Sequence, residues 1–140
     1  MDIFRIIIRR RFRRRRTRRQ PASSRRDFNK HRELARALVH ERVKHWSAVY
    51  GVTVGKIAIR NQRSRWGSCS RRGNLNFNYR IVRLLPHLAD YLIVHELCHL
   101  KEFNHSKAFW NLVEQSIPDY KIRRGELRSV KLYASLQTEV

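Results

Sequence analysis

The spacing of apolar residues first indicates a long helix. From Phe28 to Trp46, apolar side chains recur at intervals of three and four residues, which is typical of an amphipathic helix. Ser24, followed three residues later by Asp27, is a pattern of the kind found at helix starts. Tyr50-Gly51 is typical of a helix end. The pattern therefore predicts a helix from near Ser24 to near Tyr50.

The apolar pattern then changes to a period of two, which indicates strands. Ile57 and Ile59 alternate with less apolar neighbours and predict one strand. The W-G-S stretch at 66–68 predicts a turn or bulge, and R-R-G-N at 71–74 predicts a hairpin turn. Residues 75–80 alternate again, so a second strand is expected with one apolar face and one amide-rich face.

Three further helices are predicted in the remainder of the chain. Pro86 suits the first turn of a helix that runs to about Phe103. Ser106 is a suitable cap for the next helix, which Pro118-Asp119 ends. A last helix is expected to run to about Leu136. The order helix, hairpin, helix, helix, helix is typical of the α+β class.

The charge distribution separates an N-terminal arm from a single domain. The chain has 140 residues and a formal net charge of +21. Residues 1–23 are Arg-rich and low in complexity, so we expect a disordered basic arm, and a domain over 24–140. Such charge attracts nucleic acid or acidic membrane surfaces nonspecifically. An Arg-rich leader also resembles a mitochondrial transit peptide. The arm residues predicted to bind nucleic acid are Arg10, Arg11, Arg13, Arg14, Arg15 and Arg16.

The cysteine count and hydropathy indicate the compartment. Cys69 and Cys98 are too few for a disulfide framework, so reduced thiols in a cytoplasmic protein are expected. No apolar run approaches the roughly 20 residues that cross a bilayer.

The stretch HELCHLKEFNH, residues 95–105, predicts a metal site that performs chemistry. On a helix, His95 and His99 lie one turn apart on one side, so both imidazoles reach one cation. Glu96 flanks this pair, where its carboxylate reaches a water and serves as general base. Cys98 is interpreted as a small packing residue. The alternative is a surface helix whose histidines face solvent, but the apolar flanks indicate a buried helix.

His105 is the predicted third ligand. It approaches the pair only if the chain bends after His99, and Asn104 tolerates the left-handed conformation that a sharp stop uses. If this turn does not form, Glu102 and Glu114 are the alternative ligands. Three protein ligands leave one zinc position for water, as in catalytic sites, so one Zn²⁺ per chain is expected.

Residues 65–120 resemble the YgjP-like zinc metallopeptidases, relatives of the SprT-type and minigluzincin proteins. The matching elements are Trp66-Gly67-Ser68-Cys69, Asn78, Pro86, Asp90-Tyr91, His95-Glu96, His99, Asn104-His105-Ser106, Phe109-Trp110 and Pro118-Asp119-Tyr120.

The resemblance implies a zincin-like fold with a small antiparallel sheet, an active-site helix and flanking helices. It implies that His95, His99 and His105 bind zinc and that Glu96 is the general base. The hairpin through Trp66 and Asn78 would supply the sheet edge along which a peptide substrate lies.

Two other functions remain open on the sequence. The arginines near the strands suit a metal-dependent hydrolase of nucleotides or other phosphates, and the arm suits a nucleic-acid-binding protein with a structural zinc. A nucleic-acid-associated peptidase would combine two of these functions. Asp90 is either an acceptor that orients a ligand histidine or a first-turn acid that faces the helix dipole. Arg63, Arg65 and Arg80 are oxyanion-stabilising candidates, although ordinary surface positions are favoured.

Overall fold

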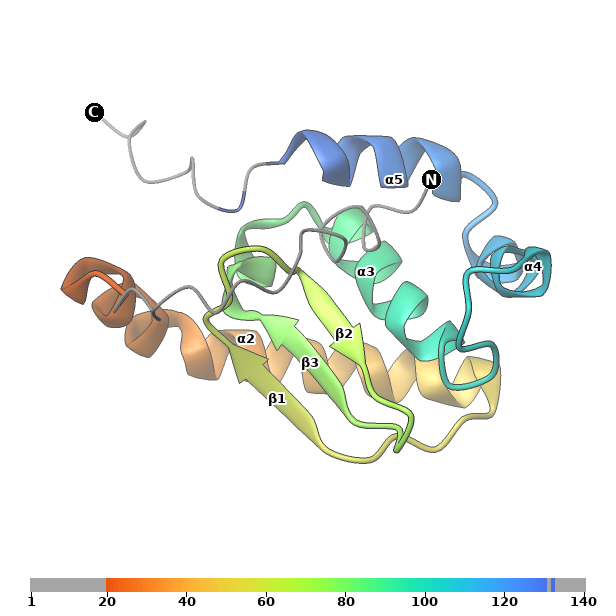
Figure 1. Ribbon diagram of the computed structural model, residues 1–140, viewed down its shortest axis with the longest axis horizontal. Coiled ribbons are helices and arrows are strands. Elements are labelled where there is room, and N and C mark those ends of the chain that lie inside the picture. Colours follow the sequence, from red (N-terminus) through yellow and green to blue (C-terminus); the bar gives the residue numbers. More distant parts are fainter. Residues whose placement is uncertain (1–19, 131, 133–140) are drawn as a thin grey trace, which may run out of the picture.

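A computed structural model describes residues 20–130 and 132, and in this part of the chain helices pack against a three-stranded sheet (Figure 1). This architecture confirms the predicted α+β class. The arm arginines 10–16 lie outside the described residues. The elements in chain order are α2 (Ala22–Tyr50), β1 (Ile57–Arg60), β2 (Gly67–Cys69), β3 (Leu75–Asn78), the 3-10 helix η1 (Tyr79–Arg83), α3 (Pro86–Cys98), α4 (Lys107–Ser116) and α5 (Tyr120–Ser129).

The sheet is mixed, with strand order β1-β3-β2. β2 and β3 form the predicted hairpin and pair antiparallel, whereas β1 pairs parallel to β3. The expectation of an antiparallel sheet is therefore wrong for β1, because the chain passes from β1 to the far side of β3 before the hairpin forms. The expectation of a turn or bulge at 66–68 is also wrong. Gly67–Cys69 is a strand, too short to show a period of two.

Three predicted helix boundaries differ from the structure. α2 begins at Ala22 after Pro21, and Ser24 does not cap it. The Ser24 hydroxyl is buried and donates to Gln20 Oε1 at 2.8 Å, so this serine is used in packing rather than as a helix start. The end at Gly51 is confirmed, with φ at 61°. α3 ends at Cys98 rather than near Phe103, and α5 ends at Ser129 rather than near Leu136.

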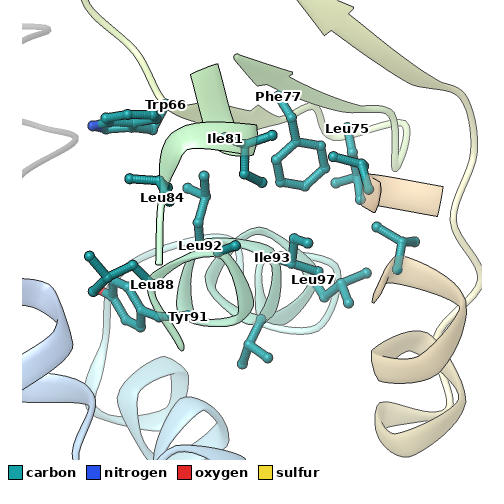
Figure 2. Close-up of a cluster of buried hydrophobic side chains, with 14 of the residues drawn as sticks. Trp66, Leu75, Phe77, Ile81, Leu84, Leu88, Tyr91, Leu92, Ile93 and Leu97 are labelled. Atoms are coloured by element: carbon teal, nitrogen blue, oxygen red, sulfur yellow. The ribbon is translucent and has the colours of Figure 1, made fainter. Parts of the chain in front are cut away.

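The hydrophobic core lies between the sheet and α3. Leu75 and Phe77 of β3 and Ile81 of η1 point toward α3, where Leu92 and Ile93 face them (Figure 2). α3 is buried at every position of its second half, residues 91–98. Because this part of the helix is enclosed on all sides, its C-terminal end is fixed relative to the sheet.

A partly buried ion pair joins α3 to α2. Arg42 of α2 donates from Nε and a terminal nitrogen to the two carboxylate oxygens of Asp90, at 2.6 and 2.8 Å. Trp46 Nε1 donates to the same carboxylate at 3.3 Å. Both predicted roles of Asp90 are therefore wrong, since its carboxylate contacts α2 and it lies beyond the first turn of α3.

No helix in the described part of the chain has both the length and the apolarity to cross a membrane.

We expect Asp90→Asn to lower the free energy of unfolding by about 1–2 kcal/mol, because a bidentate charge-assisted pair is replaced by weaker bonds. Urea unfolding at fixed metal concentration measures this change. Asp119→Asn is the matched control, since its exposed pair with Arg123 contributes only about 0–0.5 kcal/mol. Equal losses in the two variants would contradict a special role for the Arg42–Asp90 pair.

Candidate metal centre

Three histidines converge where α3 ends. His95 lies in the last turn of α3 and is fully buried, and His99 directly follows the helix. The chain then turns through hydrogen bonds from the backbone N–H groups of Lys101 and Glu102 to the carbonyl of Cys98. His105 comes next, before α4. The expected bend after His99 is confirmed, but no non-glycine residue in the described part of the chain has positive φ, so Asn104 is not left-handed.

The cap of α4 fixes the other side of the bend. Ser106 is the N-cap residue, and its hydroxyl accepts a hydrogen bond from the backbone N–H of Phe109 at 3.3 Å. This confirms the cap expected from the sequence. The Ser106 cap sets the direction of α4 directly after His105. As a result, the His105 ring lies near the end of α3.

The spacing of the three rings suits a small tetrahedral ion. His95 Nε2 lies 3.3 Å from His99 Nε2 and 3.1 Å from His105 Nε2. Two ligand nitrogens at about 2.0–2.1 Å from zinc and at a tetrahedral angle are separated by about 3.3 Å. Within the described residues, these three histidines are the group whose ligand atoms all lie within 4.8 Å of one another. Neither Glu102 nor Glu114, the alternative ligands, belongs to it.

Hydrogen bonds and burial leave the rings in a form that can bind a cation. His99 Nδ1 lies 3.2 Å from the carbonyl oxygen of Glu102, so Nδ1 carries the proton and Nε2 is unprotonated. Tyr91 Oη lies 3.5 Å from His95 Nδ1. Burial, with added effects from His99, His105 and Arg124, holds the pKa of His95 well below its ordinary value. His95 is therefore neutral, which is the form that binds a metal.

Phe109 contacts all three imidazoles, a role that the sequence analysis did not identify. Its ring stacks on His99 with centroids 4.5 Å apart and lies 4.9 Å from both His95 and His105. The residue is fully buried. Phe109 lies in the first turn of α4, four residues after His105, and this short separation is the signal that could have identified it.

Glu96 lies beside the histidines, against strand β2. Its side chain is buried, and a Cβ added at Gly67 would lie 3.2 Å from Glu96 Cγ and Oε1. A glycine inside a strand often marks such a close approach, so Gly67 was a sequence signal for the contact with Glu96.

Burial, together with the charge of Glu96, raises the pKa of Cys69 to about 11, so its thiol is protonated. Burial also raises the pKa of Cys98 to about 12, in agreement with its predicted packing role.

The two predicted substrate-binding residues occupy structural positions. Trp66 is 8% exposed and packs in the core near Ile81 and Leu84 (Figure 2). Asn78 is fully buried, and its amide donates to the carbonyls of Gln62 and Arg65 at 2.7 and 3.0 Å. These bonds hold the segment that leads into β2. The two buried side chains therefore help to position β2 and do not form a surface open to substrate.

The arginines considered as oxyanion-stabilising residues differ in their exposure to solvent. Arg63 is exposed, whereas Arg80 is 3% exposed, so the favoured surface position is wrong for Arg80. Its guanidinium donates to Asn61 Oδ1 at 3.3 Å and lies over the Tyr79 ring. Arg80 is buried because η1, which replaces the end of the predicted strand, turns it inward.

Comparisons with known proteins agree with this geometry. The model of the family described as "YgjP-like, metallopeptidase domain" matches residues 4–130. Among solved structures, the metallopeptidase zymogen of abylysin from Pyrococcus abyssi is similar, with 25% identity and a TM-score of 0.59. The match covers 64% of this chain and 90% of that one. The zymogen of jannalysin from Methanocaldococcus jannaschii shares the fold, with 23% identity, a TM-score of 0.55 and coverage of 64% and 91%. No curated protein matches significantly.

We expect the purified protein to bind one divalent cation tightly, with a rise in melting temperature, because an ion that binds only the folded state stabilises it. His105→Ala should remove most of this rise and lower the bound metal measured by mass spectrometry. His40→Ala, which changes an exposed histidine of α2, should leave both unchanged. A His105→Ala protein with the parent's metal content would contradict the three-histidine site.

Proposed function

The chain belongs to the YgjP-like metallopeptidase family, and on this basis we propose that it is a zinc-dependent peptidase whose ligands are His95, His99 and His105. The observation that carries the proposal is the convergence of three imidazole nitrogens at the end of a buried helix. The family match also favours peptide bonds over the phosphate esters of the alternative hydrolase. When bound, zinc would act as a Lewis acid on the substrate carbonyl and lower the pKa of a coordinated water.

Glu96 is the proposed general base. It follows His95 directly on α3, so its carboxylate and the ligand imidazoles are carried by one rigid element. In this proposal the carboxylate accepts a proton from the attacking water and passes it to the leaving amine. Its contact with Gly67 supports this role, because the absence of a side chain there leaves the Glu96 carboxylate its space between α3 and β2.

The proposed substrate path follows β2. Among the described strands, β2 pairs with β3 alone and lies at the edge of the sheet. An extended peptide added to such an edge is held by main-chain hydrogen bonds. Because Gly67 of β2 adjoins Glu96, a peptide on this edge passes close to the general base. Trp66 and Asn78 support this path by fixing the segment before β2.

We expect Glu96→Gln to retain zinc and to lower kcat/KM on peptide substrates by about 10²–10⁴-fold, because the amide does not accept the proton. A quenched fluorescent peptide assay and a metal determination on the same preparation measure the two quantities. Glu114→Gln, at an exposed position of α4, is the matched control and should match the parent. A Glu96→Gln protein as active as the parent would remove Glu96 from the mechanism.

The surplus of positive charge supports a second proposal, association with nucleic acid. The net charge is +21, and the arm is its densest basic segment. Binding by this arm would be electrostatic and would weaken steeply with salt.

Replacing Arg10, Arg11, Arg13, Arg14, Arg15 and Arg16 by glutamine should reduce the slope of log Kd for duplex DNA against log salt, because fewer counterions are released on binding. Fluorescence anisotropy at several salt concentrations measures the slope. Replacing Arg25, Arg26, Arg32 and Arg36 of α2 by glutamine is the control for charge outside the arm. An unchanged slope in the arm variant would show that the arm is not the contact.

A further inference from the structure

A basic cavity adjoins the candidate metal centre. Its volume is about 410 Å³. Three segments line it, namely residues 52–53 after α2, the β2–β3 turn at 70–73, and residues 99–101 with Phe103, which follow α3. His99 belongs both to the wall of this cavity and to the histidine cluster. A group bound in the cavity therefore lies next to the proposed reaction centre.

The charged residues that line the cavity are all positive. Its lining includes the cations Arg71, Arg72 and Lys101 and no Asp or Glu. All three cations are exposed. In the described part of the chain, none of them forms an ion pair, whereas Arg42 and Arg83 are paired with carboxylates. Within the described residues, no carboxylate therefore neutralises the positive charge in this cavity, and this charge can attract an anion.

A local contact holds Arg71 in position. The Arg71 guanidinium lies 4.6 Å from the centroid of the Phe103 ring, a cation–π arrangement that joins the β2–β3 turn to the segment after α3. Gly73 has φ at 79°, and a Cβ added there would lie 3.5 Å from Leu100 Cδ2, so the turn contacts the segment that follows α3. The turn and the α3–α4 segment thus form one wall of the cavity.

We propose that this cavity is a specificity subsite that binds an Asp or Glu side chain of the peptide substrate near the cleaved bond. The inference rests on the proposed peptidase function. β2 ends at Cys69, and the chain continues directly into Ser70 and Arg71 of the cavity wall. A peptide that extends along β2 past Glu96 reaches the cavity within a few residues. Arginine suits this role, because its planar guanidinium binds a carboxylate through two parallel hydrogen bonds.

The test uses the zinc-loaded full chain and a peptide series of otherwise uncharged sequence, in which Glu, Gln or Lys replaces one residue at each position. At one position near the cleaved bond, kcat/KM for Glu should exceed that for Gln by about tenfold, as one charge-assisted hydrogen bond predicts. Arg71→Glu and Lys101→Glu should each remove most of this Glu-over-Gln preference, because each places a carboxylate in the lining and leaves only two of its three cations. A ratio between peptides is used because general damage to the protein lowers the rates for all peptides alike.

Two further measurements separate this inference from the proposed function. Lys30→Glu makes the same charge change on an exposed part of α2 and should keep the parent's preference. Binding of the same peptides to the zinc-loaded Glu96→Gln protein, measured by fluorescence anisotropy, should show the same Glu-over-Gln order without turnover. Cleavage without a Glu preference at any position would overturn the subsite and leave the peptidase standing. A Glu preference in binding that Arg71→Glu removes, with no cleavage by the parent, would support the anion-binding subsite and overturn the peptidase.

Discussion

The structure around the candidate site depends on the close approach of three imidazole rings. Nε2 atoms 3.1–3.3 Å apart are tolerated only while the rings are neutral or share a cation. Burial of His95 favours the neutral form, and the contact between His99 and the carbonyl of Glu102 selects the ring nitrogen that carries the proton. The enclosed position of α3, the bend after His99 and the cap of α4 all serve to maintain this approach.

Much of this arrangement could be predicted from local sequence. The separation of His95 and His99 follows from helix geometry, the cap at Ser106 from its side chain, and the end of α2 from Gly51, because each depends on a few neighbouring residues. The strand at Ile57–Arg60 and the hairpin turn were likewise visible from a period of two and a turn sequence.

The features that escaped prediction depend on distant parts of the chain. The parallel pairing of β1 with β3 results from the path of residues 61–66 across the sheet, which no local pattern encodes. Asp90 contacts Arg42, 48 positions earlier, so its role is visible only once α2 and α3 are packed. Phe109 and Gly67 each leave a weak local signal, but their contacts with His99 and Glu96 form only when α4 and β2 pack against the end of α3.

The hydrogen bond from the Tyr50 hydroxyl to the carbonyl of Leu112, at 2.7 Å, has a consequence for ion selectivity. It joins α4 to the end of α2 through atoms that belong to neither the ligands nor the bend. Together with the buried ring of Phe109, it anchors α4 independently of any ion, so the triangle of His95, His99 and His105 is preorganised. A rigid triangle discriminates by radius and coordination number, and ions that demand longer bonds or more ligands must distort it at an energetic cost. In the proposed metal site, this rigid scaffold therefore restricts which divalent ions bind without distorting the histidine triangle.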